Sequence, residues 1–493
     1  MKKTAKRSLA ALLAVILLFS CVGMSVSAEG ETGYEVIRVN STMYGDAKTQ
    51  RGFTWFTEKS CDTILRVVDK ASYNTNGFED AIVYEGTTKA FEGYYSHKVV
   101  ATELKKGTTY FYQVGSARKN SWSDVGSFVT DNGDGKFSFI AIADVQASNL
   151  EDFQKAAAVM NAAIKKTPKA EFVVNLGDFV NDCTNEEWNW YDEAFKDINM
   201  NLTIAPVAGN HEGNITNKLN VGWFDNMFNL PAGDGAANGV NGTYYSFDYG
   251  NTHFCVLNSN DMYPMTEAQR NWVMNDLANS TAQWKVLMLH RAVYSAGKNI
   301  NKPDTLAMRE TVIDIVDKTD VDVVLSGHDH MYFRTKQVKG DAVCEDTTYV
   351  TEKFNGKDTT FAKNPDGAVY ILPSTAGTKR YTVNENPINP INECADVKFS
   401  TRDWGGCFAN IEVSGGKLVY KAYVLNEETN KVELVDEYAI KKTTKAEENE
   451  ESKLPTDALG TIDGSVANFF TEIFGLIFTY IFEFIPQLIG GLF

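Results

Sequence analysis

The spacing of apolar residues changes along the main part of the chain, and the change marks two domains. Over residues 34–130, short apolar runs such as Thr63–Val68 alternate with polar positions, and turn-forming residues separate the runs. This period of two predicts an all-β sandwich. Over residues 136–440, apolar strands alternate with helical patterns before hairpins return, which predicts an α/β domain.

Signals for individual elements agree with this division. Asn149 is a good helix N-cap and Pro168 is a helix stop, so together they predict a helix over residues 151–166. Thr266 and Gln269 have the spacing of a capping box, which predicts that a second helix begins there. Apolar runs predict strands at residues 137–143, 170–176, 203–207, 284–289 and 321–325.

The N-terminal end has a character of its own. Basic residues within Lys2–Arg7 precede an apolar run, and small residues follow at Val26–Ala28, so residues 1–28 are predicted to be a cleaved signal peptide. A retained membrane anchor and a lipid attached to Cys21 are the alternatives. Cleavage would leave a secreted, extracellular protein.

The C-terminal end combines a charged segment with an apolar one. Residues 441–463 are rich in Glu and Lys, which predicts a flexible linker. Residues 464–493 are dense in Phe, Ile and Leu, and a helix there would carry one narrow polar stripe that contains Glu472 and Glu483. The wide apolar face predicts membrane contact or self-association, and the two carboxyl groups disfavour a spanning helix. Such a tail would associate the protein with a membrane or cell surface.

Composition narrows the range of functions. The chain has 493 residues, and its formal net charge of −17 excludes a nucleic-acid backbone as the main partner, because no cationic surface would offset phosphate repulsion. Cleavage of the signal would remove one of seven cysteines, and the even number that remains permits disulfides in an exported chain. A pair among Cys344, Cys394 and Cys407 is expected.

Side chains of the kinds that bind metal ions follow five of the predicted strands. The carboxyl ends of neighbouring strands meet at one crevice of an α/β sheet, so these side chains are expected to converge. Four of the six histidines lie in these motifs, and His253, outside them, is expected to be packed or hydrogen-bonded. The motif residues that we consider are Asp144, Gln146, Asp178, Asn210, His211, His290, Arg291, His328 and His330.

The order of these motifs resembles that of the calcineurin-like metallophosphoesterases. The β-domain in front makes the chain similar to the purple-acid-phosphatase-like enzymes, and its segment Leu104–Gly115 resembles the tyrosine corner of a fibronectin type III sandwich. The resemblance covers about residues 34–441. It implies a catalytic domain of two mixed sheets packed face to face with helices outside.

The same resemblance implies two divalent or mixed-valence metal ions, with iron, zinc or manganese as the expected elements. It assigns the first ion to Asp144 and His330, the second to Asn210, His290 and His328, and both ions to a bridging Asp178. The two ions would share a hydroxide that attacks phosphorus in line. His211 would stabilise or protonate the leaving oxygen, and Arg291 would either contact phosphate or be a surface charge.

Three positions depart from the purple acid phosphatase pattern. Asn181 stands where those enzymes carry a metal-binding Tyr, which argues against tyrosinate-bound iron. Gln146 stands where many relatives carry a His, and its side-chain oxygen would complete the first metal site without adding charge. The segment Val293–Lys298 contains none of the histidines that purple enzymes place there.

These features favour a phosphatase that acts on phosphorylated small molecules, with phosphomonoesters as the expected substrates. A phosphodiesterase for nucleotides or phospholipid head groups is the first alternative, because the substrate-binding histidines are missing. A surface binding protein with an inactive phosphoesterase core is an alternative of another class.

The C-terminal segment can be tested by truncation. Ending the chain after Lys442 should leave metal content and turnover unchanged, because the charged linker separates the apolar tail from the catalytic domain. The truncated protein should no longer sediment with liposomes or elute as an oligomer. A loss of turnover in an otherwise folded protein would place the tail in the catalytic domain instead.

Overall fold

The computed structural model describes residues 32–213, 222–231, 243–262 and 264–443. The predicted signal peptide at 1–28 and the apolar tail at 464–493 lie outside these residues. Among the helices that are described, none has both the length and the apolar character needed to span a membrane.

The N-terminal domain is a β-sandwich, as its period-two pattern predicted. Apolar residues from both sheets fill its core, among them Phe53, Trp55, Leu65, Tyr112 and Val114. One sheet contains β1 (Ile37–Thr42), β3 (Arg51–Thr57), β7 (Tyr94–Ala101) and β6 (Thr87–Phe91). The other contains β10 (Gly126–Val129), β8 (Thr109–Ser116), β4 (Ile64–Asp69) and β5 (Ile82–Glu85), with β9 (Ser121–Trp122) paired to β8 and the short helix α2 (Lys70–Asn76) following β4.

Two polar residues of this domain have structural roles. The Tyr110 hydroxyl accepts a hydrogen bond from the backbone N–H of Lys105 at 2.9 Å, which is the contact of a tyrosine corner. His97 is buried, stacks on Trp55 and contacts the Thr57 hydroxyl at 2.8 Å. Burial lowers the pKa of His97 to about 4, so this imidazole is neutral.

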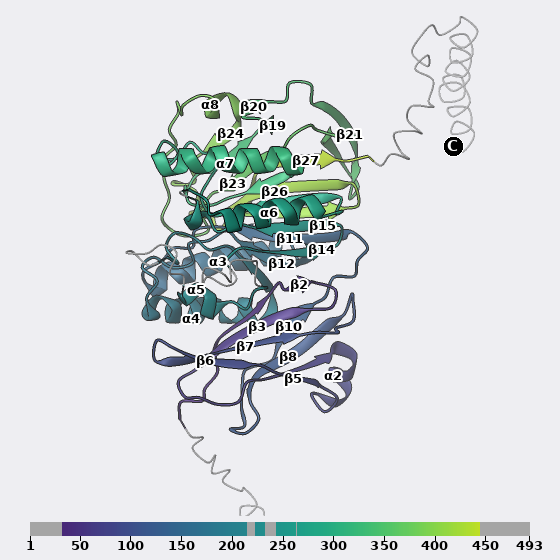
Figure 1. The fold of residues 1–493 in the computed structure, drawn as a ribbon, viewed down its shortest axis with the longest axis vertical. Coiled ribbons are helices and arrows are strands. Elements are labelled where there is room, and N and C mark those ends of the chain that lie inside the picture. The colour runs from purple at the N-terminus through teal and green to yellow at the C-terminus, as the bar shows by residue number, and fades with distance from the viewer. Residues whose placement is uncertain (1–31, 214–221, 232–242, 263, 444–493) are drawn as a thin grey trace, which may run out of the picture. The chain divides into compact units, whose positions relative to one another are not determined.

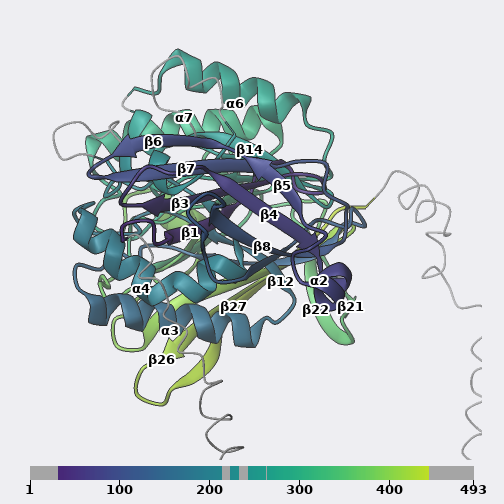
Figure 2. The same ribbon diagram turned by 90° about the horizontal axis from the view of Figure 1, so that it is seen from below.

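The α/β domain consists of two mixed sheets packed face to face, with helices on both outer faces (Figures 1 and 2). The first sheet contains β21 (Thr348–Phe354), β22 (Lys357–Lys363), β27 (Lys431–Lys441), β26 (Lys417–Asn426), β25 (Gly405–Ser414), β11 (Lys136–Ile142), β12 (Ala170–Asn175) and β13 (Thr203–Pro206). The second contains β2 (Gly45–Asp46), β14 (Tyr245–Tyr249), β15 (Thr252–Val256), β16 (Trp284–Met288), β17 (Val323–Leu325), β23 (Val369–Pro373), β18 (Tyr332–Thr335) and β24 (Ala395–Phe399).

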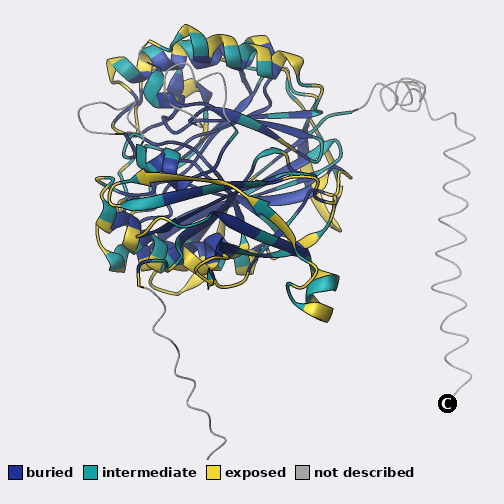
Figure 3. Ribbon diagram, turned by 60° about the horizontal axis from the view of Figure 1, so that its bottom comes forward, coloured by how far each residue is buried: buried dark blue, intermediate teal, exposed yellow. Residues whose placement is uncertain are grey.

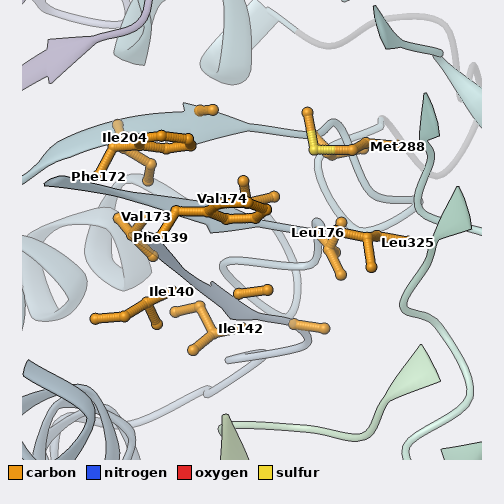
Figure 4. Packing of buried hydrophobic residues seen from close by; sticks show 14 of the residues in the cluster. Phe139, Ile140, Ile142, Phe172, Val173, Val174, Leu176, Ile204, Met288 and Leu325 are labelled. Atoms are coloured by element: carbon orange, nitrogen blue, oxygen red, sulfur yellow. The ribbon is translucent and has the colours of Figure 1, made fainter. Parts of the chain in front are cut away.

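Apolar side chains between the two sheets form the main core. Phe139, Phe172 and Ile204 come from adjacent strands of the first sheet, and Met288 and Leu325 come from the second (Figure 4). The helices α3 (Leu150–Lys166) and α4 (Asn185–Asn201) flank the first sheet, and α6 (Glu267–Asn279) and α7 (Pro303–Thr319) flank the second. Their outer surfaces are exposed while the strands between them are buried (Figure 3).

Helix capping only partly follows the prediction. Asn149 caps α3 by accepting from the N–H of Asp152 at 3.0 Å, as predicted. Thr266 caps α6 as well, but the Gln269 side chain bonds the backbone of Asn258 and does not complete a capping box. The Gln269 amide is buried there, and two hydrogen bonds to Asn258 satisfy it better than an exposed N-cap would.

The cysteines do not pair. Within the described ranges, all six are free thiols, which contradicts the expected disulfide among Cys344, Cys394 and Cys407. Their sulfur atoms have other partners: Cys344 donates to the Asp366 carbonyl, and Cys394 lies 3.8 Å from the Asp341 carbonyl. Cys407 is buried in the main core.

The two domains share their sheets. The backbone of β1 pairs with β13 in parallel, so one 12-stranded sheet runs through both domains. Arg38, fully buried between them, donates to the Asn185 carbonyl at 3.3 Å, and its guanidinium lies 5.1 Å from the ring centre of Trp223. Cation–π contact and the hydrogen bonds of Nη2 therefore offset part of the cost of burying this charge at the domain boundary.

His253 is hydrogen-bonded, as predicted, between Asp248 at 2.8 Å and Asp276 at 2.9 Å. Burial alone would lower the pKa of His253, but the two carboxylates outweigh it and raise the pKa to about 9. A raised folded-state pKa stabilises the protein fully below about pH 6.5, the unfolded value, and this contribution is lost as the pH rises through 9.

His253→Gln should therefore reduce the free energy of unfolding more at pH 6 than at pH 10, by about 2 kcal/mol. Denaturant titrations of both proteins at the two pH values would measure the difference. His97→Gln is the matched control, because the lowered pKa of His97 gives the opposite trend with pH. An equal effect of His253→Gln at both pH values would contradict the charged state of this histidine.

Candidate metal centre

The five motifs meet where the two sheets face each other at the carboxyl ends of their strands. Asp144 follows β11, Asp178 follows β12 and Asn210 follows β13, whereas His290 follows β16 and His328 follows β17. The sequence prediction that these side chains converge is therefore correct. All five elements belong to the buried centre of the domain, which fixes their ends rigidly.

Backbone strain concentrates at this point. Asp144, Gln146, Asp178 and His328 have φ angles of 54°, 33°, 55° and 76°, which place non-glycine residues in the left-handed region. Such conformations are costly, and they persist at functional sites where the surroundings enforce them. The backbone of Gly209 packs directly against Asp178, because a Cβ atom at Gly209 would lie 2.2 Å from the Asp178 carboxylate.

His330 and Asp144 form the first pair of candidate ligands. The Nδ1–H of His330 donates to the Lys379 carbonyl, which leaves Nε2 as the acceptor. This Nε2 atom points at the buried Asp144 carboxylate, 3.4 Å from Oδ1. Both Asp144 oxygens also accept from the backbone N–H of His328 at 3.0 Å.

His290 is oriented in the same way toward Asp178. Its Nδ1–H donates to the Leu176 carbonyl at 2.8 Å, and its Nε2 lies 3.1 Å from Asp178 Oδ2 and 3.2 Å from Asn210 Oδ1. Acceptor atoms that face each other at these distances repel unless a cation or a proton lies between them. The arrangement therefore fits a metal ion that is held by imidazole, carboxylate and amide groups.

Two further atoms support this fit. The Nε2 atom of His328 and the Oε1 atom of Gln146 are buried and have no hydrogen-bond partner, so Oε1, and Nε2 in the tautomer protonated at Nδ1, could bind a cation. Two triads of ligand atoms lie close enough to hold a metal ion, and they share Asp178. These are Asp178 with His290 and His328, and Asp144 with Asp178 and His330.

The charges of the site are strongly coupled. Burial would raise the pKa of Asp178, but His290, His211 and His328 hold it well below its ordinary value. Burial would lower the pKa of His290, but Asp178 raises it to about 9. Burial, with the charges of His290 and Arg291, lowers the pKa of His328 well below its usual range. His328 is therefore neutral, as a metal ligand must be.

Glu212 is a site residue that the sequence motifs did not single out. Its buried carboxylate accepts from the backbone N–H groups of Asp178 at 2.9 Å, Phe179 at 2.8 Å and Gly209 at 2.8 Å. Glu212 thereby connects the segment of Asp178, after β12, to the segment of Asn210, after β13. Burial and the negative charge of Asp178 raise the pKa of Glu212 to about 8. Its place directly after His211 was the only sequence signal for this role.

Asp329, between two motif histidines, was also missed. Its buried carboxylate accepts from the Ser295 hydroxyl at 2.8 Å and from the Asn299 amide at 2.8 Å. It therefore holds the loop that follows β16 against the segment that carries His328 and His330. The sequence His-Asp-His could have indicated this role. The side chain between two candidate ligands points away from the metal site, so it can bind a neighbouring segment.

His211 and Gln146 lie together at the edge of the site. The half-exposed His211 donates its backbone N–H to Asp178 Oδ1 at 2.9 Å, and its Nδ1–H donates to the Asn181 carbonyl. Its Nε2 contacts the Gln146 amide nitrogen. The Asn181 side chain bonds Asp182 at 3.0 Å instead of entering the site.

Arg291 is buried, which differs from the surface-charge alternative. Its backbone N–H donates to the Ser259 hydroxyl at 3.1 Å, and its guanidinium lies 3.4 Å from the Asp304 carboxylate on α7. The ion pair fixes the guanidinium near His328, whose pKa it helps to lower.

Comparison with known proteins gives the family of each domain. Residues 137–332 match the calcineurin-like phosphoesterase family, and residues 37–130 match the purple acid phosphatase N-terminal domain. Acid phosphatase type 7 of Danio rerio is 23% identical over 66% of this chain and 75% of its own length. An uncharacterized protein of Mycobacterium tuberculosis is 27% identical, and the match spans only 39% of either chain.

The fold has the same relatives. The structure of purple acid phosphatase PPD1 from yellow lupin seeds superposes with a TM-score of 0.68 at 17% identity, covering 83% of this chain and 75% of the lupin protein. This likeness shows the fold alone. The two family matches show that the chain contains a purple acid phosphatase N-terminal domain at residues 37–130 and a calcineurin-like phosphoesterase domain at residues 137–332.

Proposed function

We propose that the protein is an exported, metal-dependent phosphatase that hydrolyses phosphomonoesters at the site around Asp178. One observation carries the proposal. The imidazoles of His290 and His330 are each fixed by a backbone carbonyl so that Nε2 faces a buried carboxylate, at 3.1 Å and 3.4 Å. Only positive charge between these atoms makes the arrangement favourable, and the shared Asp178 suits two cations.

The contacts support two ligand sets. Asp144 and His330 would hold one cation, with the free oxygen of Gln146 beside them. Asn210, His290 and His328 would hold the other, and Asp178 would bind both. Bound there, two such cations supply Lewis-acid activation of water and neutralise charge on the phosphoryl oxygens.

The protein side chains would orient the substrate and move the proton. His211 has its Nδ1–H committed to the Asn181 carbonyl, so its Nε2 side faces the site and Gln146. With a second proton on Nε2, the imidazolium would stabilise the leaving oxygen or transfer that proton to it. The buried Arg291 adds positive charge near His328, which favours an anionic substrate.

Asp178→Asn tests the assignment. The variant should lose bound metal and slow hydrolysis of 4-nitrophenyl phosphate by at least about 100-fold, because an amide cannot neutralise two cations. Metal content by mass spectrometry, turnover and circular dichroism would be measured together. Asp346→Asn, an exposed position far along the chain, is the matched control and should keep both properties. Wild-type metal content and turnover in Asp178→Asn would show that the ligand assignment is wrong.

A phosphodiesterase is the second candidate, and one observation favours it. The loop after β16 lacks the histidines that purple acid phosphatases place there. Its polar residues Ser295 and Asn299 both donate hydrogen bonds to Asp329 instead of facing a substrate. A phosphomonoester has three non-bridging oxygens, one more than a diester, and this loop supplies no imidazole to bind the additional oxygen.

The two candidates differ in one paired measurement. With 4-nitrophenyl phosphate and bis(4-nitrophenyl) phosphate as substrates, we expect the monoester to have the higher kcat/KM, because its second negative charge is attracted to the cations. A higher kcat/KM for the diester would identify a phosphodiesterase. Absence of hydrolysis of both by a metal-loaded protein would favour a binding protein with an inactive core.

A further inference from the structure

The loop between β16 and α7 is held with unusual firmness beside the candidate metal centre. Asp329 accepts from Ser295 and Asn299, and the Gly297 N–H donates to the Ser295 hydroxyl at 2.8 Å. A Cβ atom at Gly297 would lie 2.3 Å from the carboxyl carbon of Asp329, so the backbone is packed directly against that side chain. Lys298 stands between two fixed positions.

The Lys298 side chain lies over an aromatic ring that belongs to the site. Its Nζ atom is 4.0 Å from the ring centre of Tyr381. That ring stacks on His330, with centroids 4.4 Å apart and planes inclined by 12°. Because His330 covers one face of Tyr381, the ammonium occupies the other. The Tyr381 ring therefore lies between His330, which faces Asp144 with its Nε2 atom, and the Lys298 ammonium.

Tyr381 is itself fixed in place. Its backbone N–H donates to the His330 carbonyl at 2.9 Å, and the nearby Asn384 N–H donates to the Ala296 carbonyl at 2.7 Å. The segment that carries Tyr381 is thus bonded both to His330 and to the loop that carries Lys298.

The charge of Lys298 is uncompensated, unlike that of neighbouring cations. Arg291 pairs with Asp304, and Arg380 pairs with Glu427. In the described part of the chain, no carboxylate lies within ion-pairing distance of the exposed Lys298 ammonium. In a chain of net charge −17, an exposed cation at the rim of a phosphate site is positioned to attract anions.

We propose that Lys298, supported on the Tyr381 ring, binds a second phosphate group of the substrate, beyond the phosphoryl group that reacts. This inference rests on the proposed function and narrows it to phosphoesters whose leaving group carries another phosphate. The Tyr381 ring separates the ammonium from His330. That separation suits a group on the leaving side, whereas the reacting phosphoryl group belongs next to the histidines. Lysine suits such a role because it binds phosphate as a flexible point charge.

Lys298→Gln isolates this contact. In the metal-loaded protein, calorimetry should show inorganic pyrophosphate binding about five- to tenfold more weakly, while inorganic phosphate binding changes less than about twofold. In turnover, the KM for glucose 1,6-bisphosphate should rise by a similar factor with kcat nearly unchanged, and glucose 1-phosphate should be unaffected. The loss should shrink at high salt, because an exposed ion pair is screened.

Three further variants make the result specific. Lys298→Arg should restore pyrophosphate binding, and Lys302→Gln, which removes an exposed charge four residues away, should have no effect. Tyr381→Leu should weaken pyrophosphate binding as Lys298→Gln does, whereas Tyr381→Phe keeps the aromatic platform and should not.

The outcomes separate this inference from the proposed function. Equal weakening of phosphate and pyrophosphate by Lys298→Gln would place Lys298 at the reacting group and overturn the inference. Unchanged binding of both, in a protein that hydrolyses monoesters, would overturn it while leaving the phosphatase intact. A wild-type protein that binds no metal and hydrolyses neither ester would overturn the proposed function and this inference together.

Discussion

The buried carboxylate of Asp178 is the constraint on which the site depends. It lies almost fully buried at the junction of the two sheets, so the protein must supply positive charge to stabilise it. His290 and its neighbours do so, and the imidazoles of His290 and His330 are each oriented by a hydrogen bond from Nδ1 to a backbone carbonyl. The backbone carbonyls at the strand ends thus decide which way the imidazoles face, and the imidazoles decide where cations can bind.

That geometry requires strained backbone conformations at the strand ends, and the surrounding structure must hold them in place. Asp144, Asp178 and His328 have left-handed backbone, and Glu212 holds the segment of Asp178 in place by accepting from the N–H groups of Asp178 and Gly209. Asp329 acts similarly on the loop after β16. Two buried acids that need not contact a substrate therefore connect motifs that are distant in sequence. Fixed loop geometry is what lets paired cations keep one separation through a reaction.

Much of this could be predicted from the sequence, and the misses have physical reasons. Candidate ligands such as Asp144 and His330 follow apolar strands, and strand ends converge, so the local pattern was sufficient to predict that these side chains lie together. Glu212 and Asp329 were missed because their partners are backbone N–H groups or side chains in other segments, which no spacing reveals. The expected cysteine pairing failed for a similar reason, because nearness in sequence does not bring Cβ atoms within bonding range.

The N-terminal domain supplies none of the candidate metal ligands, but it supports a strand that leads to one of them. Strand β13, which leads to Asn210, has β12 on one side and β1 of the N-terminal domain on the other. The N–H of Met43 donates to the Ile204 carbonyl at 3.0 Å, so a backbone group of β13 finds its partner in the other domain. Without β1, this strand would be an edge with unpaired backbone groups next to the third motif. The buried Arg38 holds the same boundary closed, so the two domains form one structural unit around the metal centre.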